Sequence, residues 1–205
     1  FQPVLGLGLG GSVYHPNLME FTLGGLFGLL QHSFRDERSN SRLSGSDDGT
    51  VLEYDFTGDF LKKKPYPGSV YAHRRQATEP REFQSSVETT ADNYGALWQY
   101  LSDKMPTRLQ FDYTDLHFHP FDSSQAESER KNLDLRFDTA YKFNEHNVLS
   151  FLYEHQSVNE QSHGDQPYKL AYDSDELTVR HRFEFGEQHQ HRLESEFDYF
   201  KQQGS

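Results

Sequence analysis

The residues Leu133–Phe143, LDLRFDTAYKF, place apolar or aromatic side chains at most odd positions and mainly charged or small ones at even positions. After the polar turn NEHN at 144–147, the alternation resumes through Leu149, Phe151 and Tyr153. Successive side chains of a β-strand point to opposite faces, so a period of two residues indicates strands. The stretch therefore predicts a β-hairpin with one apolar face and one polar face.

A second hairpin follows between Leu177 and Tyr199, around the turn GEQH at 186–189. If Phe183 lies opposite Leu193, opposite charges meet at three successive positions of the polar face, which is favourable cross-strand pairing. A slip by one residue would place charges on the apolar face, so this register is favoured. The predicted pairs are Arg180 with Glu196, Arg182 with Glu194, Glu184 with Arg192 and, on the apolar face, His181 with Ser195.

The composition limits the classes of function. The chain has 205 residues, with 32 acidic and 20 basic side chains and a formal charge of -12, which argues against nucleic acid as the main partner. It has no cysteine, so disulfides and thiolate metal sites are excluded. No apolar run approaches the ~20 residues of a transmembrane helix. No signal peptide precedes Phe1, so we expect a mature or trimmed chain, or a piece of a longer one.

The alternating pattern recurs along the whole chain. Short turns near residues 16, 65, 104, 145 and 188 connect the two strands of each hairpin, and longer polar loops connect one hairpin to the next. We therefore predict a single domain of residues 1–205 with five hairpins and about ten strands, without a linker. The polar loops are expected at Arg35–Gly49, Gln76–Ser85, Pro120–Asn132 and Val158–Asp175.

This rhythm resembles the outer-membrane β-barrel proteins of Gram-negative bacteria, which have long antiparallel strands, an apolar outer band and a polar interior. The row Leu133–Phe143 covers 11 residues, close to the ~9–11 that a tilted strand needs to cross a bilayer. The resemblance implies an all-β, antiparallel up-and-down meander forming all or part of a transmembrane barrel in the bacterial outer membrane. It implies lipid-facing residues Leu133, Leu135, Phe137, Tyr141, Phe143, Phe183 and Phe197, and lumen-lining residues Arg136, Asp138, Arg180, Arg182, Glu184, Arg192, Glu194 and Glu196.

The expected function is that of a pore or scaffold with a charge-lined lumen rather than an enzyme, with no cofactor and no metal. The expected partners are membrane lipid and further strands of a larger barrel, or a plug or partner protein. In this arrangement both chain ends lie at the loop end. The first and last strands must then either pair with each other or belong to a larger barrel. We favour the larger barrel. The alternative is a soluble periplasmic or extracellular antiparallel sheet that binds a glycan or protein partner.

Two motifs suggest chemistry, each with a plainer interpretation. The glycine run Gly6–Gly11 matches a dinucleotide-binding pattern, but the residues after it continue as a strand rather than opening a helix. His117 and His119 share one strand face, yet a metal site needs further converging ligands, so polar residues at a wet strand end are favoured. The same two histidines with Asp115 are the only candidates for a barrel-embedded hydrolase.

Overall fold

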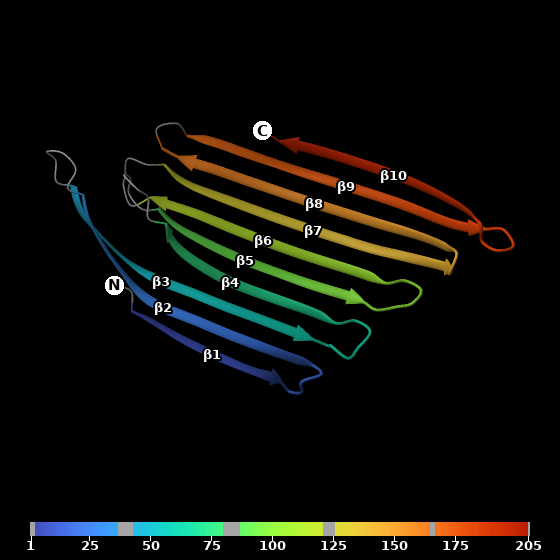
Figure 1. Ribbon diagram of the computed structural model, residues 1–205, viewed down its shortest axis with the longest axis horizontal. Helices are drawn as coiled ribbons and strands as arrows, with labels where there is room; N and C mark the ends of the chain where they lie inside the picture. The colour runs from blue at the N-terminus through green and yellow to red at the C-terminus, as the bar shows by residue number, and fades with distance from the viewer. Residues whose placement is uncertain (1–2, 37–42, 80–86, 121–125, 165–166, 205) are drawn as a thin grey trace.

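Ten β-strands form one continuous sheet in the computed structural model, which describes residues 3–36, 43–79, 87–120, 126–164 and 167–204. Each strand pairs antiparallel with its neighbours in sequence, so the order across the sheet is β1 to β10 (Figure 1). The predicted all-β meander of about ten strands is thus confirmed. The strands are β1 Val4–Val13, β2 Met19–Asp36, β3 Leu43–Phe60, β4 Gly68–Glu79, β5 Val87–Tyr100, β6 Thr107–Pro120, β7 Glu127–Asn144, β8 Asn147–His163, β9 Tyr168–Phe185 and β10 His191–Gly204.

The register of the two best-patterned hairpins agrees with the sequence. In β9–β10, Phe183 pairs with Leu193, and His181 pairs with Ser195. The β7–β8 hairpin turns between Asn144 and Asn147. The alternating pattern was sufficient to predict the register because a slip of one residue would exchange the two faces of a strand.

The polar loops predicted between the hairpins are wrong in extent. β3 begins at Leu43, inside the first predicted loop, and β4 continues to Glu79, inside the second. β7 begins at Glu127, and β9 begins at Tyr168 rather than near Asp175. Backbone groups pair in a ladder whatever side chains they carry, so the strands run on beyond their apolar residues. We call these outer parts of the strands the polar extensions.

The sheet is a single layer. Among the described residues, the backbone of each strand lies close only to the strands paired with it. The buried hydrophobic side chains are Val51, Val87 and Val158, and pairing places all three on the face opposite the aromatic rows. Within the described part of the chain, the aromatic rows are therefore not packed against a second layer. No helix in the described part of the chain is long and apolar enough to cross a membrane.

The sheet is open and staggered. β1 and β10 are its two edges, and the short turns step progressively along the strand direction from β1–β2 to β9–β10 (Figure 1). β1 begins and β10 ends at the side of the polar extensions, opposite the short turns, as the sequence predicts.

Candidate functional site

The apolar and aromatic rows of the ten strands lie on one face of the sheet, which we call the apolar face. Cross-strand pairing carries this face from strand to strand: Phe137 lies opposite Leu109 on β6 and Tyr153 on β8. Its side chains are largely uncovered, with Phe197 59% exposed and Leu7 74% exposed. The seven residues predicted to face lipid all belong to it: Leu133, Leu135, Phe137, Tyr141, Phe143, Phe183 and Phe197. Soluble monomers rarely expose so continuous an apolar surface, so we expect a protein partner, a ligand or lipid to cover it.

The border of the apolar face toward the polar extensions runs obliquely across the strands. One row of directly paired residues leads from Gly25 on β2 to Ala171 on β9. Apolar residues reach past this row to Leu29 on β2, by about four residues, but stop about six residues short of it on β9, at Leu177. The border thus shifts by roughly 33 Å along the strands over the roughly 34 Å between β2 and β9, which corresponds to a strand tilt of about 45°.

This tilt sets the height of the apolar band. The row Leu133–Phe143 spans about 33 Å along β7, which projects to about 23 Å across the band at a tilt of about 45°. The band is narrower on β6 and β8, where Thr107 and Asn147 occupy its turn-end positions. Outer-membrane barrels combine strand tilts of about 35–45° with an apolar band about 25 Å tall.

Tyrosines and charged side chains meet at the border with the polar extensions. Tyr54 donates a 3.2 Å hydrogen bond to Asp92, and Arg74 holds the same carboxylate through two bonds of 2.7 and 2.6 Å. On β8 and β9, Tyr153 donates a 2.7 Å bond to Asp175. Each ring belongs to the apolar face while its hydroxyl reaches a polar group, which is the arrangement that an apolar–aqueous boundary favours.

His181 places a polar imidazole ring within the apolar band. Pairing places it opposite Leu149 and Ser195. Its Nε2 atom lies 2.8 Å from the Oδ1 atom of Asn147, the first residue of β8. The imidazole therefore has a hydrogen-bond partner within the sheet, which lowers the cost of placing it on an apolar surface.

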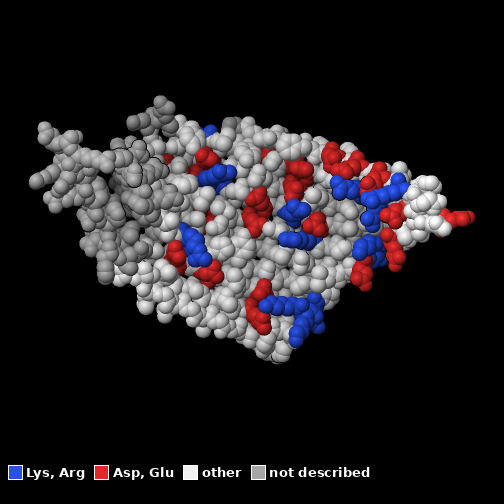
Figure 2. Space-filling model, viewed as in Figure 1, with Lys and Arg blue, Asp and Glu red and all other residues white. Residues whose placement is uncertain are grey.

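The opposite face, which we call the polar face, carries acidic and basic side chains interspersed in small groups (Figure 2). One open hollow of about 770 Å³ is lined in part by Arg108, Asp138 and Arg180. A second, of about 490 Å³, is lined in part by Asp112 and Glu154. All residues predicted to line a lumen lie on this face: Arg136, Asp138, Arg180, Arg182, Glu184, Arg192, Glu194 and Glu196.

The ion pairs of the polar face follow the register only in part. Arg180 Nη2 lies 2.9 Å from Glu196 Oε2, as the predicted ladder requires. Arg182 pairs in register with Glu194, but that carboxylate binds Arg192 on its own strand. Long arginine side chains reach neighbours along a strand as well as across it, and at such exposed positions each pair contributes little to stability.

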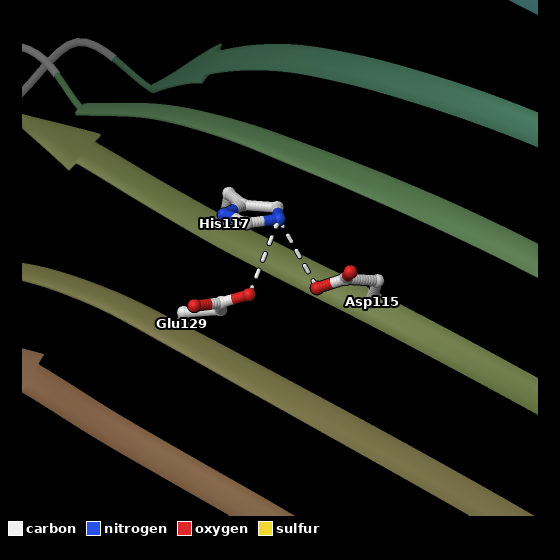
Figure 3. Close-up of side chains that lie close together, drawn as sticks. All are labelled: Asp115, His117 and Glu129. Atoms are coloured by element: carbon white, nitrogen blue, oxygen red, sulfur yellow. Dashed lines mark ion pairs between the residues drawn. The ribbon is translucent and has the colours of Figure 1, made fainter.

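The polar extensions bring together the histidine and carboxylate candidates. His117 Nε2 lies 3.1 Å from Asp115 Oδ1 on β6 and 3.8 Å from Glu129 Oε1 on β7 (Figure 3). We call these three residues the β6–β7 cluster. His119 is not part of it, because it pairs with Glu127 at 2.8 Å. Glu129 could not be recognised in the sequence, since only the β6–β7 register makes it a neighbour of His117.

The glycine run Gly6–Gly11 lies inside β1 and opens no helix, which confirms that it is not a dinucleotide-binding loop.

No protein-family model matches this chain, and no curated protein matches it in sequence. Its function must therefore be inferred from the geometry of the two faces.

Proposed function

We propose that the chain forms all or part of a transmembrane β-barrel of the bacterial outer membrane, acting as a pore or scaffold with a polar, charge-lined lumen. The observation that carries this proposal is the uncovered apolar face, which crosses all ten strands at a tilt of about 45°. Lipid would supply the cover that the rest of the described chain does not.

The polar face supplies the lumen in this proposal. Its hollows are open and lined by both signs of charge, so it offers water and polar solutes a hydrated wall. Arg136 and Glu154, joined at 2.7 Å, hold their charges in place on this wall. Such a wall selects solutes by charge and size, and it also suits docking of a polar plug or partner protein.

The absence of cysteine gives a direct test of which face meets lipid. Leu135 and Arg136 are adjacent residues on opposite faces, so Leu135→Cys and Arg136→Cys form a matched pair. After reconstitution into lipid vesicles, a water-soluble maleimide should modify the cysteine at position 136 and leave that at 135 largely unmodified. A spin label at 135, but not at 136, should be relaxed by lipid-dissolved oxygen.

Two results would contradict the proposal. One is equal labelling of both cysteines by the aqueous reagent. The other is a wild-type chain that stays soluble without detergent and does not enter vesicles. Either result would favour the alternative, a soluble sheet whose apolar face binds a glycan or protein partner. A detergent-solubilised barrel should instead migrate differently on gels before and after heating.

A further inference from the structure

The β6–β7 cluster, Asp115, His117 and Glu129, converges from two neighbouring strands. Its three candidate ligand atoms, one from each side chain, all lie within 4.8 Å of one another. Figure 3 shows both carboxylates directed at the same imidazole nitrogen, at 3.1 and 3.8 Å. Ligand atoms about 2.0–2.2 Å from a tetrahedral zinc ion are roughly 3.3–3.6 Å apart, so modest side-chain movements would bring all three to a common ion.

The surroundings hold the cluster in position. Gln161 on β8 donates a 2.8 Å hydrogen bond to Glu129 Oε2, leaving the other carboxylate oxygen facing His117. The Oδ1 atom of Asp115 is buried and lies 3.1 Å from His117 Nε2, but the two atoms do not have the geometry of a hydrogen bond. His117 itself is half exposed, so the cluster is open to solvent on one side. Outer groups that orient the ligands and an open position for water are features of zinc sites.

Lys131 balances the charge of the cluster. Its ammonium group contacts Glu129 and lies 4.0 Å from Asp115 Oδ2. The lysine therefore competes with a metal ion for these carboxylates.

We propose that the β6–β7 cluster binds a divalent transition-metal ion of the Zn²⁺ class, with Asp115, His117 and Glu129 as ligands and water in the fourth position. An imidazole with two carboxylates matches the ligand preference of Zn²⁺ better than that of Ca²⁺ or Mg²⁺, which favour oxygen ligands alone. The cluster lies outside the apolar band, so the site does not depend on whether that band is in lipid.

A neighbouring row of carboxylate and imidazole side chains offers further metal ligands. Glu88 pairs with His119, and Glu127 pairs with His163, while His119 and Glu127 lie 2.8 Å apart. Carboxylates and imidazoles thus alternate across four adjacent strands, β5 to β8. This row lies about two residues further along the polar extensions, so its side chains are the next available ligands beyond the cluster.

The test uses the purified chain of 205 residues in detergent at pH 7.5, titrated with ZnCl₂ against a chromophoric zinc chelator. The wild-type chain should bind one ion tightly. His117→Ala should weaken this binding about tenfold or more. His155→Ala is the matched control, because His155 contacts one carboxylate, Asp175 at 2.8 Å, and should leave the affinity unchanged.

Two further variants keep the test decisive. Glu129→Gln should weaken zinc binding like His117→Ala and replaces the latter if its circular dichroism shows that it has not folded. Lys131→Met should strengthen binding, because it removes the competing ammonium group. The proposal is overturned if the wild-type chain takes no zinc from the chelator, or if the cluster variants bind zinc as the wild type does.

Discussion

At the scale of single residues, Gly95 on β5 shows how closely the polar face is packed in places. The ring of Tyr71 from β4 lies over the glycine, and its hydroxyl donates a hydrogen bond to Asp112 on β6. A Cβ atom at position 95 would overlap the tyrosine ring. The glycine therefore lets one side chain link three strands.

Gly95→Ala should destabilise the protein by about 1–3 kcal/mol, because the added methyl group forces Tyr71 out of its position. The measurement is reversible denaturant unfolding in detergent micelles or lipid vesicles. Gly8→Ala is the matched control: a Cβ there meets nothing within 4 Å, so a change below about 0.5 kcal/mol is expected. In a Tyr71→Ala background the Gly95→Ala penalty should largely disappear, and an unchanged penalty would show that Tyr71 is not its cause.

Single residues also show where sequence reasoning ended. His117 was a candidate from the sequence because it shares one strand face with His119, and Asp115 was named with these two histidines as a candidate for a barrel-embedded hydrolase. Glu129 is separated from them by the β6–β7 connection and becomes a neighbour only through pairing. His181 appeared as an isolated polar group on the apolar face, and its partner Asn147 likewise comes from another strand. Local spacing reveals the neighbours within a strand, whereas those across strands require the register.

At the scale of strands, the existence and register of the hairpins were predictable but their lengths were not. Alternation marks the part of a strand with two different faces, and this part was found correctly on β7, β9 and β10. In the polar extensions the face that carries the aromatic rows becomes polar and apolar residues are sparse, so the two-residue alternation that marks a strand is weak. The charge ladder of β9–β10 fixed the register, although only one of its three predicted cross-strand ion pairs forms.

A charge-exchange experiment tests that ladder. Arg180→Glu alone should destabilise the protein slightly, and combining it with Glu196→Arg should restore most of the loss, because the ion pair is rebuilt in reverse. Both side chains are exposed, so the coupling free energy should be about 0.2–1 kcal/mol and should fall when salt is added.

The control is the same exchange at Arg182 and Glu194, which are paired in register but form no ion pair with each other. Its coupling should be near zero in a double-mutant cycle measured by denaturant unfolding. Equal coupling at both positions would mean that register alone, rather than the observed contact, governs the pairing of charges.

At the scale of the whole molecule, the two edges of the sheet determine what the proposed barrel needs. β1 and β10 each have a neighbour on one side only within the described chain, and unpaired backbone groups are very costly in lipid. The two edge strands run in opposite directions, so they have the polarity needed to pair antiparallel with each other. Additional strands at both edges would satisfy the same requirement, as would closure with a second chain.

The depth of the apolar band gives a prediction that a soluble sheet cannot share. Phe137 lies near the middle of the band on β7, and Phe143 lies at its turn-end margin on the same strand and face. In lipid vesicles, Phe137→Arg should cost about 2–4 kcal/mol of unfolding free energy, whereas Phe143→Arg should cost about 1 kcal/mol or less, because the charge at the margin reaches water. Phe137→Ala and Phe143→Ala correct for lost packing, which matters because Phe137 contacts Phe151 edge-on. If the arginine penalty, after this correction, is the same at both positions, the apolar face is not spanning a bilayer.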